Sequence, residues 1–351
     1  GYNRSPYVDL RSRFANGLVH RGGDDFVLGR GQSPVAKDTS RPSAANVRAV
    51  VAPALLNVLE ERLSVHMLTA SMIALAKIGD DRSPRPILPV LVPFLRHGEQ
   101  RVAETATIAL GILASEEAAP ILASLLRDDA EGRRLVGGHR VPIRVQTFAA
   151  YGLGLAGRST TDMGLRRSIA TDLVATLELG LQPHPDLQFG ALSALSIMPL
   201  PWTSPPIALD GHEAIARDRV ALLRYLVKRV DPDSRGDGGF EDDRVRAHVP
   251  TTIGRLLADG VAAAPAPAID ARIHAVDALL DAIAPHSREK DALVAQSATI
   301  ALGAVGDAST GPSPVGRQNE RIVSSLSRIA TYAPRNQSEH FALMALARLG
   351  A

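Results

Sequence analysis

An acidic segment of the chain, "DPDSRGDGGFEDD" at 231–243, carries the clearest pattern of metal-ligand residues. Four aspartates occupy positions one, three, seven and twelve of a calcium-loop pattern: Asp231, Asp233, Asp237 and Asp242. Calcium prefers carboxylate oxygens at such positions. However, Arg235 stands at the fifth position, where an oxygen ligand is needed, and the twelfth residue is not the bidentate Glu. The pattern favours a solvated acidic loop, and calcium is the only cofactor that the sequence suggests.

Other chemically active patterns are absent or lack the context that they need. The chain has no cysteine, which excludes thiol nucleophiles and Cys-ligated metals. "GLGLAG" at 152–157 has the glycine spacing of a dinucleotide fingerprint, but it lies at the end of a predicted helix and does not follow a strand. His212 and Glu213 lack the second histidine of a zincin helix, and neither a G-x-S-x-G elbow nor a P-loop occurs. We predict no catalytic residues and a protein that is not an enzyme.

A short apolar segment repeats along the chain. "ATIALG" occurs at 106–111 and again at 298–303. Five similar segments of small and aliphatic residues begin at Ser71, Ala149, Ala191, Val249 and Ala342. The copies start 35 to 58 residues apart, a period that is typical of helical repeat arrays.

Each copy closes a segment that has helical periodicity. Val102, Ala106 and Leu113 recur at helical spacing and predict one apolar helix face. A second helix with the same periodicity precedes most copies, so the unit is a pair of helices, repeated about seven times. Because neither helix can bury its apolar face alone, neighbouring units must stack. The sequence predicts an all-α solenoid over 45–351, which could continue beyond the C-terminus.

The repeated small residues have a predicted role in this stacking. Ala109 and Gly111 are expected to let a neighbouring helix approach closely, and Ala301 and Gly303 occupy the equivalent places. Leu110 is expected to fill the space between the layers.

The first 44 residues differ from the array because they carry four aromatic residues, Tyr2, Tyr7, Phe14 and Phe26. We predict that the segment 1–44 is a cap over the open end of the array. An arm that binds a partner is the alternative.

Two stretches carry a family resemblance. "TIALGILASEEAAPILASLLRDD" and "ATIALGAVGD" resemble HEAT repeats, especially the short repeats of phycobilisome-lyase-like proteins. The resemblance implies a right-handed superhelix whose second helices line the concave side. Iron-dependent HEAT enzymes that resemble deoxyhypusine hydroxylase use several His-Glu pairs, and this chain has one. The family's usual Val-Arg pair appears only at Val245 and Arg246.

Seven residues occupy equivalent places on the predicted inner helices, each five residues before a repeated segment. They form a row: His66, Arg101, Arg144, Asp186, Arg244, Leu293 and Gln337. The four basic members of this row are His66, Arg101, Arg144 and Arg244. They could form a basic surface that binds an acidic peptide or a phosphate. Alternatively, these side chains pair with acids such as Glu104 or Asp243 and stabilise the stack.

Insertions between the helices supply further candidates for partner binding. The segment 128–140 contributes Arg133, Arg134, His139 and Arg140, and a Pro-rich segment holds the only tryptophan, Trp202. The preferred interpretation is that these insertions are surface loops that the fold tolerates. The alternative is that they bind a partner.

Charge and composition narrow the function. The formal charge of +2 and the single tryptophan argue against nucleic acid, and no apolar run reaches the length of a membrane span. We predict a scaffold that binds another protein or an extended peptide along its concave surface and insertion loops. A structural part of a larger exported or envelope assembly is one alternative, and a nucleic-acid-binding HEAT-like protein or a HEAT-type lyase is another. The compartment stays open between the cytoplasm and export, with a preference for export.

Overall fold

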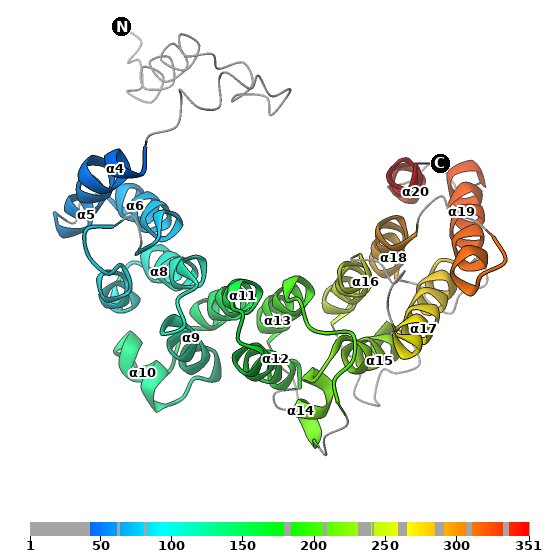
Figure 1. Cartoon of the computed structure of the whole chain (residues 1–351), viewed down its shortest axis with the longest axis horizontal. Helices are drawn as coiled ribbons and strands as arrows, with labels where there is room; N and C mark the ends of the chain where they lie inside the picture. The colour runs from blue at the N-terminus through cyan, green and yellow to red at the C-terminus, as the bar shows by residue number, and fades with distance from the viewer. Residues whose placement is uncertain are drawn as a thin grey trace, which may run out of the picture.

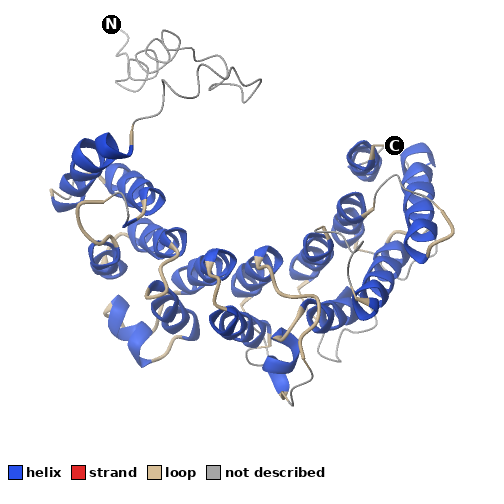
Figure 2. Cartoon of the chain, in the orientation of Figure 1, coloured by secondary structure: helices blue, strands red, loops and turns tan. Residues whose placement is uncertain are grey.

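The structure is a computed structural model that describes residues 43–61, 64–80, 83–178, 184–205, 209–230, 240, 242–258, 265–284, 291–306, 311–332 and 337–350. Within these ranges every regular element is helical and no strand occurs (Figure 2). None of the described helices has both the length and the apolar character needed to cross a membrane. The predicted cap at 1–44 lies almost wholly outside the described residues.

The helices form two layers that follow one arc (Figure 1). The inner layer comprises α6 (Val65–Ile78), α8 (Gln100–Leu113), α11 (Ile143–Ser159), α13 (Pro185–Ile197), α16 (Asp243–Leu257), α18 (Ala292–Val305) and α20 (Gln337–Leu349). The outer layer comprises α5 (Ala52–Glu60), α7 (Leu88–Leu91) with the 3-10 helix η3 (Val92–Arg96), α9 (Ala118–Arg127), α12 (Met163–Leu177), α15 (Arg219–Val230), α17 (Ala266–Ala282) and α19 (Pro314–Tyr332). Each inner helix packs against the next inner helix along the chain. The predicted all-α solenoid of about seven helix pairs is confirmed.

Four shorter elements complete the described part of the chain: α4 (Ala44–Asn46), the π-helix η1 (Val47–Val51), α10 (Ala130–Val136) and α14 (Gly211–Ala216). The interpretation of 128–140 as a plain surface loop is wrong, because its middle is α10. This helix packs against α9 and η3, and Leu135 is buried. Asp129 caps its start by accepting a hydrogen bond from the backbone N–H of Gly132 at 2.9 Å.

Side-chain capping explains where several inner helices begin. Ser64 caps α6, Asp242 caps α16 and Asp291 caps α18, each by accepting a hydrogen bond from a backbone N–H of the first turn. Such caps satisfy amide groups that have no partner inside the helix. The caps hold the first turns of these inner helices in place.

The repeated segments lie where neighbouring inner helices come closest. A β-carbon placed on Gly111 of α8 would lie 2.2 Å from the Cα of Gly152 in α11. The same addition to Gly303 of α18 would lie 2.6 Å from the Cα of Ala345 in α20. Leu110 and Leu302 are both fully buried. The predicted role of the small residues is therefore confirmed: they allow the backbones of adjacent inner helices to approach, and leucines fill the core beside them.

Candidate binding surface on the inner helices

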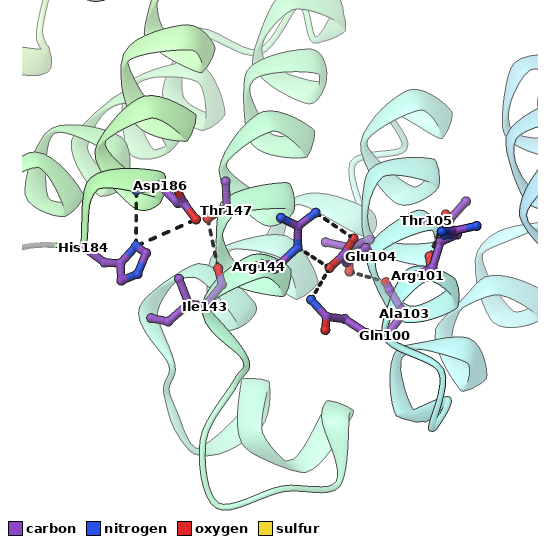
Figure 3. Close-up of polar contacts among 11 residues, drawn as sticks. Gln100, Arg101, Ala103, Glu104, Thr105, Ile143, Arg144, Thr147, His184 and Asp186 are labelled. Carbon is purple, nitrogen blue, oxygen red and sulfur yellow. Dashed lines mark hydrogen bonds and ion pairs between the residues drawn. The ribbon is translucent and has the colours of Figure 1, made fainter. Parts of the chain in front are cut away.

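The predicted row of residues lies in the first turn of the seven inner helices. We call it the first-turn row: His66, Arg101, Arg144, Asp186, Arg244, Leu293 and Gln337. Asp186 is half-buried and the other six are exposed. Figure 3 shows Arg101, Arg144 and Asp186 on the neighbouring helices α8, α11 and α13. The row therefore occupies equivalent places at the start of successive inner helices.

Arg144 is held by a carboxylate of the preceding inner helix (Figure 3). Its Nε and Nη2 atoms donate to the two carboxylate oxygens of Glu104 at 2.6 and 3.2 Å. Gln100 donates to the same carboxylate at 2.6 Å. Burial alone would raise the pKa of Glu104, but the hydrogen bonds from Arg144 and Gln100 outweigh it and lower that pKa. The pair joins α8 to α11, which is the stabilising alternative predicted for this arginine.

The other basic members of the row differ from Arg144. Arg244 bonds to Asp242 at 2.8 Å, just before its own helix, and the predicted partner Asp243 instead bonds to Arg246 at 3.3 Å. His66 and Arg101 are exposed, and their backbone carbonyls accept hydrogen bonds from threonine hydroxyls one turn later. The basic members of the row are thus a mixture of ion-paired and solvent-facing side chains.

The contact between Arg144 and Glu104 predicts an acid-dependent contribution to stability. Because the pKa of Glu104 is lowered by folding, its contribution is present above the unfolded value of about 4.3 and is lost as the pH falls through the folded value. We expect Glu104→Gln to lower the melting temperature at pH 7 by about 1–3 °C. Between about pH 5 and pH 3, the variant should lose less stability than the wild type. Thermal melts at several pH values measure both effects, and parallel pH profiles would contradict the assignment.

A second set of residues follows the first-turn row seven positions later on each inner helix. We call it the inner stripe: Ile73, Ile108, Tyr151, Ser193, Thr251, Ile300 and Met344. Residues seven apart lie on the same helix face, so the stripe runs beside the row across the whole inner layer. All seven side chains are at least partly exposed, and Ile300 and Met344 are 38% and 66% exposed. Every inner helix thus contributes one at least partly exposed side chain to the stripe, and five of the seven are apolar or aromatic.

Aromatic side chains gather at the middle of the inner stripe. The rings of Phe148 and Tyr151 on α11 meet edge to face with centroids 6.1 Å apart, and the guanidinium of Arg144 lies 5.9 Å from the Phe148 centroid. Phe189 on α13 and His248 on α16 have ring centroids 4.7 Å apart. Burial, followed by the nearby charge of Arg255, lowers the pKa of His248. Sequence reasoning missed these residues.

The predicted loop residues do not join this surface. Arg133 donates to both oxygens of Asp128 at 3.0 and 3.1 Å, and Arg134 donates to Glu131 at 2.7 Å. Arg140 and His139 are exposed beyond α10, which lies on the outer side of the arc (Figure 1).

Trp202 is half-buried and packs against the core. The guanidinium of Arg219 lies 4.9 Å from the centroid of its ring. These contacts give the tryptophan a packing role.

The predicted calcium ligands fall mostly outside the described residues, which exclude Asp231, Asp233 and Asp237. Asp242 is described, and it caps α16 and binds Arg244. Across the described ranges, no three His, Asp or Glu side chains gather in a way that could hold a metal ion.

Comparison with known proteins agrees with this architecture. Residues 50–136 match the family model for HEAT repeats, and no curated protein matches the chain. A designed armadillo repeat protein, solved in complex with the peptide (KR)4, is 17% identical, with 75% of this chain and 99% of that chain covered and a TM-score of 0.42. Human deoxyhypusine hydroxylase in complex with glycerol is 15% identical, with 99% of each chain covered and a TM-score of 0.29. These distant similarities do not indicate what this chain binds.

The molecule therefore belongs to the class of α-solenoids. Within it, residues 50–136, from η1 through α10, match the family model for HEAT repeats, in agreement with the sequence resemblance.

Proposed function

We propose that the protein is a non-enzymatic scaffold that binds an extended segment of another protein along the inner stripe. The observation that supports the proposal is the recurrence of the stripe on all seven inner helices. A partly exposed side chain from every inner helix contributes to it, and most of these side chains are apolar or aromatic. Repeat arrays commonly use such elongated concave surfaces for binding.

The chemistry of the surface suits a peptide in extended conformation. Tyr151, Phe148 and Phe189 offer rigid rings, which contribute contact area at low cost in side-chain entropy. Arg101 in the adjacent row is exposed and can interact with peptide carbonyl or carboxylate oxygens at the edge of the stripe. Since the helices are already folded, little ordering of the protein opposes binding.

A substitution at the centre of the stripe tests this function. Peptides are first selected on the wild-type protein from a random displayed library, and their affinities are then measured by fluorescence anisotropy. We expect Tyr151→Ala to weaken binding by about tenfold or more, because a central aromatic anchor is removed. The matched control is Tyr332→Ala, which removes the same side chain from the outer helix α19, where it is 80% exposed.

Circular dichroism should show that both variants remain folded. The proposal predicts that Tyr332→Ala binds as the wild type does. If no peptides are enriched, or if the two tyrosine variants bind equally well, the inner stripe is not the binding surface.

A further inference from the structure

Two cavities that share lining residues open beside the inner helices α13 and α16, and the first of them also reaches α18. The first has a volume of about 240 Å³ and is lined by hydroxyl-bearing residues together with His248 and Arg255. The second, of about 420 Å³, lies toward the C-terminal ends of α11, α13 and α16. Ser196 and Arg255 line both cavities, so Arg255 stands at their junction.

The charges around this junction have one sign. Arg158, Arg219 and Arg255 line the second cavity, and no acidic residue lines either cavity. Nη1 of Arg255 donates to the hydroxyl of Ser196 at 3.2 Å. Within the described ranges Arg255 contacts no carboxylate, which distinguishes it from Arg144 and Arg244 of the first-turn row. Arg255 therefore keeps donors for an incoming anion.

Hydroxyl groups surround the same point. Ser193, Thr251 and Ser297 line the first cavity from three successive inner helices. No other described group is hydrogen bonded to their side chains, whereas Ser196 donates to the carbonyl of Ser193 at 2.7 Å. Three hydroxyls and a guanidinium without a carboxylate partner form a cluster of donors. Such a cluster matches a phosphate group, whose charge and several acceptor oxygens need more than one donor.

We propose that Ser193, Thr251, Arg255 and Ser297 form a site for a phosphate group carried by the bound peptide. The proposal rests on the function proposed above, because the site lies beside the inner stripe and two of its residues, Ser193 and Thr251, belong to that stripe. It adds the chemistry of the partner, which is a segment with a phosphorylated side chain. His248 lines the same cavity, and a phosphate bound there would favour the protonated form of its ring and so raise its pKa.

The first experiment uses inorganic phosphate as the probe. The imidazole resonance of His248, assigned by its loss in His248→Gln, is followed by NMR while phosphate replaces chloride at constant ionic strength and pH 7.5. We expect a saturable shift in the wild type. In Arg255→Gln and in Ser193→Ala, half-saturation should need about tenfold and several-fold more phosphate, respectively. Arg224→Gln, an exposed arginine on the outer helix α15, should behave as the wild type.

The second experiment compares a degenerate peptide library with a fixed central phosphoserine against the same library with serine. We expect the wild type to enrich the phosphorylated library about tenfold, and Arg255→Gln to abolish that preference. No saturable shift with phosphate, or an unchanged half-saturation in Arg255→Gln, would overturn the site. So would equal retention of the two libraries.

These outcomes separate the two proposals. If the phosphate site fails while Tyr151→Ala still weakens peptide binding, only the site is wrong. If phosphate binds at Arg255 but Tyr151→Ala has no effect on any peptide, the scaffold function along the inner stripe is wrong and the anion site stands.

Discussion

Leu110→Asp is expected to lower the melting temperature by about 10 °C or more, because it places an unpaired carboxylate in the core between the helix layers. Leu110 has no exposed surface, and its neighbours in α8, Ala106 and Ala109, are also fully buried. A buried charge without a partner costs about 3–5 kcal/mol, a large part of the stability of a typical domain. Calorimetry or circular dichroism melts measure the change, and a low soluble yield would be the same effect seen during expression.

Two further variants show whether the effect comes from burial. Leu110→Met keeps the volume and the apolar character, so it should cost less than about 1.5 kcal/mol. Ile300→Asp introduces the same charge at a position that is 38% exposed on the inner stripe, and its melting temperature should fall much less. A wild-type melting temperature for Leu110→Asp would mean that the packing register of α8 is wrong.

The second large effect is expected from adding one methyl group at the closest approach of two inner helices. In Gly111→Ala the new β-carbon would lie 2.2 Å from the Cα of Gly152, so the backbones of α8 and α11 must separate. Overpacking of this kind costs about 1–3 kcal/mol or more, whereas alanine recovers about 0.5–1 kcal/mol of helix propensity. We expect a net loss of about 2 kcal/mol, and because the unfolding entropy grows with chain length, a melting temperature about 3 °C lower.

The same substitution at other glycines gives an ordered series. A β-carbon added to Gly303 would lie 2.6 Å from its nearest neighbour, and one added to Gly254 would lie 3.0 Å away, so the loss should decrease from Gly111 to Gly303 to Gly254. Gly98→Ala is the control, because nothing lies within 4 Å of its added β-carbon. A melting temperature for Gly111→Ala at or above that of Gly98→Ala would contradict the close approach.

The helix pairs could be predicted from the sequence because their signal is local and repeated. Apolar spacing in segments such as 101–114 defines α8, and the repeated order of small residues in "ATIALG" marks the helix contact. In contrast, α10 was missed because Gly132 makes the segment resemble a loop. In the structure this glycine is required by packing, since its β-carbon would lie 2.2 Å from the carbonyl oxygen of Ser124.

The candidate site was harder to predict because its contacts join different repeats. Arg144 and Glu104 are 40 residues apart, and only the stacking of α8 on α11 determines that these two side chains meet. The inner stripe was missed for another reason. It is the third residue of each repeated segment, such as Ile108 or Tyr151, and this position varies in a comparison that looks for what the copies share. The available signal was the contrast between this variable position and the fifth position of the segment, which is always Leu or Ile.

The glycines between inner helices also determine the geometry that a partner meets. The inner helices line the concave side of the arc, and their close approach at these glycines contributes to its curvature (Figure 1). The distance between successive stripe residues, for example from Ile108 to Tyr151, therefore depends on the side-chain volume at Gly111 and Gly152, which are buried between α8 and α11. A larger residue there would flatten the arc and lengthen that interval, so residues hidden in the core decide which spacing of peptide side chains the surface accepts.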